Sequence, residues 1–117
     1  MMNLLCISTL HEELDVPAGL SDHTLETQLV PVAACALGAT LFEKHMKLAG
    51  DTTSVDAGHA LDPTQFATYV QTIRETCLAL GDGVKAPHPS ETHDVLWARR
   101  GSDNLRPTDA ARQGRWV

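Results

Sequence analysis

The segment of residues 18–45 places the strongest constraint on how this chain can fold. It consists of a short apolar run ending in Ser21-Asp22-His23, an apolar helical stretch, and a second short apolar run ending in Glu43-Lys44-His45. This order predicts a strand, a helix and a strand, with an acid and a histidine at the end of each strand. The two histidines are 22 residues apart, which is about the length of one strand-plus-helix unit with its turns.

Such a unit would bring the two histidines together. Equivalent residues of successive units in a parallel sheet lie side by side, because neighbouring strands are roughly 4.8 Å apart. His23 and His45 could therefore share one metal ion, and the neighbouring carboxylates of Asp22 and Glu43 could orient the rings or transfer protons. A histidine at a strand end is more often a simple surface or hydrogen-bonding residue, so the residues alone leave both interpretations open.

Composition and charge narrow the class of protein. The formal net charge of −6 disfavours a general nucleic-acid binder, which needs a basic surface. Cys6, Cys35 and Cys77 are odd in number and far apart, as expected of free thiols in a reducing compartment. No basic and apolar leader follows Met1, and no apolar run reaches the roughly 18–20 residues that span a membrane. We therefore expect a cytoplasmic protein without a membrane partner.

Further helices are predicted on both sides of the central segment. Helices are predicted at residues 3–14, 25–37, 62–80 and 90–100, and strands at residues 16–20 and 39–46. Asn3 and Thr24 are the expected caps of the first two helices, and Pro31 lies in the first turns of the second helix or kinks it. Asp62 and Gln65 predict a capping box at the start of the third.

The predicted sheet is too small for the predicted helices. Two parallel strands cannot cover the apolar faces of three to four helices, and parallel sheets are normally covered on both faces. Residues 47–61 form a long polar connection, and residues 101–117 show no periodicity and are expected to be extended or disordered. We therefore expect either self-association, a partner chain, or a place within a larger domain.

Six motifs in order resemble the sialic acid (N-acetylneuraminate) synthase family: GLSDHT, ALGATLFEKH, the Asp56 that follows it, LDPTQF, ALGDGVKAP and ARR. Members of this family condense phosphoenolpyruvate with N-acetylmannosamine or a related hexose. They have a (β/α)8 barrel followed by a small antifreeze-like domain. The resemblance implies an α/β fold, a partial TIM barrel in which residues 1–100 hold strands seven and eight with their helices. Residues 101–117 would be a linker or the truncated start of the second domain.

The resemblance also implies a metal site. In the family, histidines at the ends of strands seven and eight hold a divalent ion, and these match His23 and His45. The ion would polarise the sugar aldehyde as a Lewis acid. Histidine ligands favour Mn²⁺ over Mg²⁺, which prefers oxygen.

Further site residues follow from the same motifs. Ser21 resembles the serine that contacts phosphoenolpyruvate, and Asp56 resembles the acid that holds a hydroxyl of the N-acetylated hexose. We assign Asp22 and Glu43 to catalysis and Lys44 to substrate binding, in supporting or electrostatic roles. The remaining histidines match no motif and are expected to face solvent: His11, His59, His88 and His93.

The chain is expected to be inactive by itself. A barrel of this type needs eight strands and about 250 residues, so the first six strands would have to be supplied by another chain. The alternative is a non-catalytic module that binds metal or associates with itself through its apolar helices.

Overall fold

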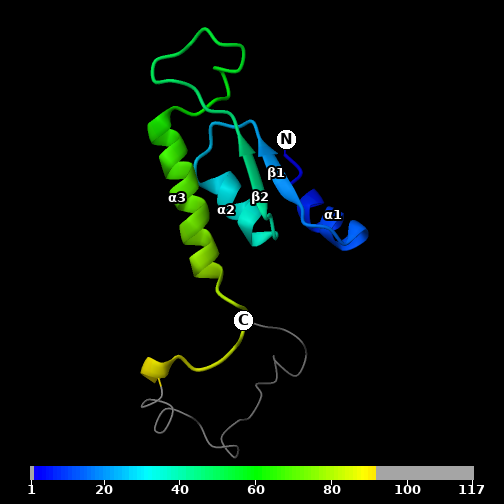
Figure 1. The fold of residues 1–117 in the computed structure, drawn as a ribbon. Coiled ribbons are helices and arrows are strands. Elements are labelled where there is room, and N and C mark those ends of the chain that lie inside the picture. Colours follow the sequence, from blue (N-terminus) through cyan, green and yellow to red (C-terminus); the bar gives the residue numbers. More distant parts are fainter. Residues whose placement is uncertain (1, 92–117) are drawn as a thin grey trace, which may run out of the picture. The chain divides into compact units, whose positions relative to one another are not determined.

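A computed structural model describes residues 2–91 of the chain, and the order of its elements follows the predicted order. The elements are α1 (Cys6–Leu14), β1 (Gly19–Asp22), α2 (Leu29–Ala36), β2 (Leu41–Lys44), α3 (Pro63–Leu80) and the short 3₁₀ helix η1 (Pro89–Glu91) (Figure 1). The chain divides into two compact units, one ending at Gly83 and the other beginning at Val84. All of these elements except η1 belong to the first unit.

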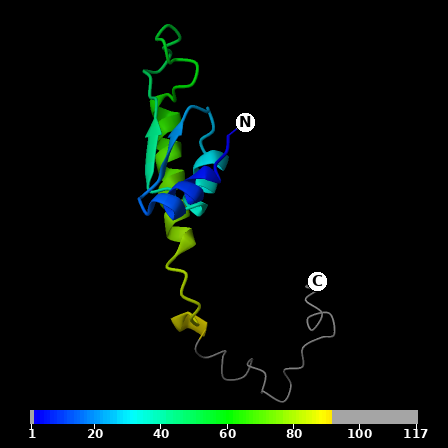
Figure 2. The same ribbon diagram turned by 90° about the vertical axis from the view of Figure 1, so that its right-hand side faces the viewer.

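The two strands pair in parallel, as predicted. Gly19 pairs with Leu41, and the register runs on to the pair of Asp22 with Lys44. A Cβ atom on Gly19 would lie only 2.4 Å from the carbonyl oxygen of Leu41, so this glycine permits the close approach of the strands. Both strands point toward the connection of residues 47–61, which lies beyond their carboxyl ends in both views (Figures 1 and 2).

Only one face of this sheet is covered within the described residues. The main apolar cluster contains Ile7 of α1, Ala18 before β1 and Ala34 of α2. The hydroxyl of Ser8 donates a hydrogen bond to the carbonyl oxygen of Leu37 at 3.1 Å and so connects α1 to the end of α2. On the other face Ser21, Leu41 and Glu43 are exposed. The sheet therefore has a packed face and an open face.

The helix between the strands begins later than predicted. Thr24 does not cap it; instead, the Thr24 N–H donates to Asp22 Oδ1 at 2.8 Å in a turn after β1. Pro31 is the third residue of α2, where its missing N–H has no intrahelical partner to lose. A helix beginning at residue 25 would place the proline ring against the preceding turn, so the later start is physically favoured.

The first helix also begins later than predicted, and α3 begins as predicted. α1 has no side-chain cap, and Asn3 contributes only its carbonyl oxygen, which accepts from Cys6 N–H at 3.1 Å. In α3, Asp62 Oδ1 accepts from the backbone N–H groups of Thr64 and Gln65 at 2.8 and 2.9 Å. The Gln65 side chain accepts from Asp62 N–H at 3.1 Å, which completes the capping box.

The apolar face of α3 is only partly covered by the part of the chain that the structure describes. This helix packs against α2, and Tyr69 is its buried residue. The Tyr69 ring also meets the Phe42 ring of β2 edge to face, with centroids 6.3 Å apart. Cys77 and Leu80, which continue the apolar spacing of this helix, are exposed.

The second unit is described only at residues 84–91. Glu91 accepts a hydrogen bond from the N–H of His88 at 2.8 Å beside η1. Most of the helix predicted at residues 90–100, and all of residues 101–117, lie outside the described residues. No helix among residues 2–91 is sufficiently long and apolar to cross a membrane.

Candidate metal centre

His23 and His45 lie together at the carboxyl ends of the two strands. Each follows the last residue of its strand directly, so the pair continues the register of Asp22 with Lys44. The two Nε2 atoms are 3.2 Å apart, and the rings meet edge to face at an interplanar angle of 64°. Two imidazole nitrogens bound to one zinc-like ion at about 2.0–2.1 Å lie roughly 3–3.5 Å apart. The donor pair therefore fits a shared divalent ion.

His59 joins this pair, which the sequence analysis did not predict. Its ring centroid is 5.1 Å from that of His23 and 4.9 Å from that of His45. One ring nitrogen from each of the three side chains lies within 4.8 Å of the others. The His59 side chain is 33% exposed and lies against both other rings, so it is only partly open to solvent, whereas His11 and His88 are exposed as expected. His93 lies outside the described residues.

No short sequence pattern pointed to His59, which reaches the site because the chain returns there before α3. The connection of residues 47–61 leaves β2 and must return to the same end of the sheet, because Leu61 forms a parallel bridge with Met46. The N–H of Leu61 donates to the carbonyl oxygen of His45 at 2.9 Å. A histidine two residues before this bridge is therefore brought back to the strand ends.

Asp56 lies beside two of the rings. Its Oδ1 is 3.3 Å from Nε2 of His59 and its Oδ2 is 3.8 Å from Nδ1 of His45. A carboxylate next to a ring nitrogen favours the proton on that nitrogen and leaves the other nitrogen free to bind a metal. For His45 that other nitrogen is Nε2, the atom that faces His23.

Ser21 and Glu43 lie on the open face of the sheet. They are partners in the strand register, and the Ser21 hydroxyl donates a hydrogen bond to Glu43 Oε1 at 2.7 Å. Both side chains are exposed. Because successive side chains of a strand alternate between its faces, Asp22 and Lys44 point the other way.

Asp22 and Lys44 form a buried ion pair on the packed face. Their side chains are 0% and 1% exposed, and Asp22 Oδ2 is 3.7 Å from Lys44 Nζ. The Lys44 ammonium also donates to the carbonyl oxygens of Asp22 and Thr24. Burial lowers the pKa of Lys44, and the attraction of Asp22 opposes this shift. Burial, followed by the Asp22 carboxylate, raises the pKa of Tyr69. The catalytic role of Asp22 and the substrate-binding role of Lys44 stay predictions.

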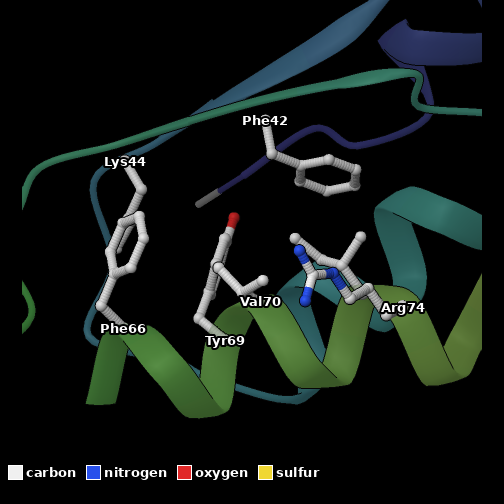
Figure 3. A pocket seen from close by; sticks show the side chains of 7 residues that line it. Phe42, Lys44, Phe66, Tyr69, Val70 and Arg74 are labelled. Atoms are coloured by element: carbon white, nitrogen blue, oxygen red, sulfur yellow. The ribbon is translucent and has the colours of Figure 1, made fainter. Parts of the chain in front are cut away.

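An apolar groove runs along the packed face between β2 and α3 (Figure 3). It is lined by Phe42, Lys44, Phe66, Tyr69, Val70, Ile73 and Arg74. Figure 3 shows the side chains of Phe66, Tyr69 and Val70 rising from α3 toward the side chains of Lys44 and Phe42 on β2. This groove lies on the face of the sheet that carries the Asp22–Lys44 pair, and it offers an apolar surface for further packing.

The sequence of this chain is similar to that of known proteins. The family model described as the NeuB family matches residues 1–85. The chain is 41% identical to an uncharacterized protein of Methanocaldococcus jannaschii, over 85% of this chain and 29% of that protein. It is 44% identical to a pseudaminic acid synthase of Campylobacter jejuni, over 70% of this chain and 24% of that enzyme.

A solved structure is similar as well. The crystal structure of N-acetylneuraminic acid (sialic acid) synthetase from Leptospira borgpetersenii, in complex with citrate, matches with a TM-score of 0.69 and 28% identity. The match covers 91% of this chain and 35% of that chain. The predicted fold class, an α/β fold that forms part of a TIM barrel, is therefore confirmed. The chain spans less than a third of the length of the curated relatives that it matches.

Proposed function

The chain belongs to the NeuB family, and on this premise we propose that it supplies the metal-holding part of a sialic-acid-type synthase site. The reaction proposed is the condensation of phosphoenolpyruvate with an N-acetylated hexose such as N-acetylmannosamine. The names of the relatives support a synthase of sialic-acid-type sugars. The two substrates, the metal and the residue roles are part of the proposal.

One observation carries this proposal. The Nε2 atoms of His23 and His45 converge to 3.2 Å although the two residues belong to different strands. Their backbones are held in register by the β1–β2 pairing, so the convergence follows from the fold. Preorganised donors of this kind are what a catalytic metal site needs, and two imidazoles leave positions open for substrate and water.

The chain's own residues would have distinct tasks around such an ion. His23 and His45 would hold it, with Mn²⁺ favoured over Mg²⁺ because the donors are nitrogens. When bound, the ion would act as a Lewis acid on the aldehyde of the acceptor sugar. Glu43, which lies on the open face and accepts a hydrogen bond from Ser21, would act in its protonated form as the general acid that gives its proton to the aldehyde oxygen as that oxygen becomes a hydroxyl.

Substrate contacts would come from the same end of the sheet. The Ser21 hydroxyl would contact phosphoenolpyruvate, and the half-exposed carboxylate of Asp56 would accept a hydrogen bond from a sugar hydroxyl. Lys44 and Asp22 would act from the packed face by holding the ends of both strands in place. Their contribution to turnover would then pass through the geometry of the histidines.

The described residues hold two of the eight strands that a barrel of this type contains. The open face with Ser21 and Glu43 would form part of the barrel interior. The groups that bind the phosphate and carboxylate of phosphoenolpyruvate would come from other strands, and preorganised donors of that kind provide most of the stabilisation. We therefore expect turnover only when the remaining strands are supplied.

A second candidate function is self-association without catalysis. The apolar groove of Phe42, Phe66, Val70 and Ile73 favours it. Leu78 on α3 is in addition 83% exposed, and exposed apolar patches often mark interaction sites. Sedimentation analysis separates the candidates, because a module of this kind would associate without any dependence on metal or on added barrel strands.

The test of the proposed function is metal binding measured by calorimetry on the purified chain. Mn²⁺ should bind at the micromolar level or better, and His23→Ala and His45→Ala should each abolish binding. His88→Ala is the matched control, because His88 is exposed and belongs to the second unit. Supplying the missing strands should then give phosphate release from phosphoenolpyruvate with N-acetylmannosamine. Mn²⁺ binding that is indifferent to both histidine changes would contradict the proposal.

A further inference from the structure

A third imidazole, that of His59, lies at the site described above and comes from the connection of residues 47–61. We infer that His59 is a direct ligand of the same ion, so that the centre has three histidines and its choice of metal depends on His59. This inference rests on the proposed function, because it assumes that His23 and His45 hold an ion.

The geometry of the three rings is the first argument. The centroid distances are 4.9, 5.1 and 4.9 Å, so the rings stand at the corners of a nearly equilateral triangle. A ring that merely packed on one neighbour would approach that neighbour more closely than the other. One nitrogen from each ring lies within 4.8 Å of the others, and the nitrogens would approach to roughly 3–3.5 Å of one another on a shared ion.

The backbone at His59 is held in place. The N–H groups of His59 and Ala60 both donate to the carbonyl oxygen of Asp56 at 3.1 Å. The Lys47 ammonium donates to the carbonyl oxygen of Ala57 at 2.7 Å. Ala57 and Ala60 are buried, and Leu61 is fully buried. His59 is therefore presented by a fixed turn and not by a freely moving loop.

Asp56 provides the third argument. Its two carboxylate oxygens approach His59 and His45, at 3.3 and 3.8 Å. One carboxylate that contacts two ligand rings can fix both ring orientations and can offset part of the positive charge of a bound divalent ion. The arrangement of three imidazoles beside a carboxylate is thus a more complete metal environment than the His23–His45 pair.

Three imidazoles have a chemical consequence that two do not. Three protein ligands plus one open position is the arrangement of catalytic zinc sites, including those with three histidines. Imidazole donors bind Zn²⁺ and Co²⁺ more strongly than Mn²⁺, so each added ring increases the preference for the later ions. We therefore expect His59 to raise the affinity for Zn²⁺ and Co²⁺ more than the affinity for Mn²⁺.

The experiment is competitive equilibrium dialysis of the purified full chain against a mixture of Zn²⁺ and Mn²⁺, with bound metal measured by mass spectrometry. Loss of a residue that only hydrogen-bonds a metal ligand typically costs about 10–100-fold in affinity, and loss of a ligand should cost at least that much. His59→Ala should lower the Zn²⁺ affinity by this factor and the Mn²⁺ affinity by less. The absorption spectrum of bound Co²⁺ should also change, because the coordination changes.

Two further variants separate a ligand from a packing residue. His59→Gln keeps a polar side chain beside Asp56 but removes the imidazole, so it should lose Zn²⁺ as His59→Ala does. Retention of the parent's Zn²⁺ preference by His59→Gln would overturn the inference. His88→Ala should leave both metals unaffected, and far-UV circular dichroism checks that each variant keeps its helices.

Failure of this inference is distinguishable from failure of the proposed function. If both His59 variants bind metal like the parent while His23→Ala and His45→Ala do not, His59 is not a ligand and the two-histidine site stands. If the His23 and His45 variants also bind like the parent, the proposed site and this inference both fall.

Discussion

The buried pair of Asp22 and Lys44 gives the sharpest prediction about stability. The charged groups are 3.7 Å apart and almost fully buried, so their attraction is about 4–5 kcal/mol at an effective dielectric constant near 20. Removing one partner leaves the other charge buried and unpaired, which typically costs about 3–5 kcal/mol. For a unit that ends at Gly83, the total stability should be about 4–12 kcal/mol. Asp22→Asn alone should therefore remove a large part of it.

A variant that replaces both residues separates the energy of the ion pair from the effect of losing either residue alone. Asn in place of Asp22 keeps the acceptor for Thr24 N–H, and Met in place of Lys44 keeps much of the apolar stem. Replacing both charges of a buried pair by uncharged groups is often neutral, so Asp22→Asn with Lys44→Met should recover most of the loss. Because each single change should cost about 3–5 kcal/mol and the double change little, urea unfolding followed by circular dichroism should give a coupling energy of about 5 kcal/mol or more, above the usual range of about 0.5–3 kcal/mol for residues in contact.

A coupling energy below about 0.5 kcal/mol, the error of such cycles, would refute this reasoning. The same variants bear on the predicted catalytic role of Asp22. If Asp22 acts only by holding the strand ends, the completed barrel should regain activity together with stability in the double variant. If the Asp22 carboxylate or the Lys44 ammonium itself takes part in the reaction, stability should return without activity.

Two other predictions concern local packing. Gly19→Ala would place a Cβ atom 2.4 Å from the Leu41 carbonyl oxygen, so it should lower the free energy of unfolding by about 1–3 kcal/mol and weaken metal binding. Gly58→Ala is the control, because the space around its Cβ is open, and it should do neither. Equal unfolding midpoints of the two variants would contradict this prediction. Burial raises the pKa of the Cys35 thiol from 9.0 to about 11, so the native state binds more protons between these values and the free energy of unfolding should fall as the pH rises from 9 to 11. Cys35→Ala should remove this part of the pH dependence, and an unchanged pH profile would contradict the assignment.

The parts of the fold that were predictable depend on neighbours in sequence. The capping box of Asp62 and Gln65 is complete within four residues, and the close approach at Gly19 follows from a glycine inside a strand. The pairing of His23 with His45 was predictable because parallel units repeat at a fixed length. Each of these features can be predicted from residues close together in sequence or from the distance between two strands along the chain.

The remaining features depend on contacts that no short pattern encodes. The Thr24 hydroxyl accepts from Glu26 N–H at 3.1 Å as a cap would, but the contacts of this segment with Asp22 hold it as a turn, and the helix begins only at Leu29. His59 lies in a polar connection without periodicity, and its place is fixed by the bridge of Leu61 to Met46. Lys44 is buried because α3 packs over this face of the sheet, and the sequence of the strand alone does not show where that helix lies.

The register of the two strands has a consequence for changes in chain length. Because side chains alternate, inserting one residue within β2 (Leu41–Lys44) would turn His45 toward the packed face and away from His23. An insertion in the turn of residues 24–28 would leave the pairing of Gly19 with Leu41 untouched and would only lengthen the path into α2. Evolution and protein engineering can therefore vary the length of this turn after Thr24, whose backbone bonds to Asp22 and Lys44, while the length of β2 is fixed by the chemistry at its end.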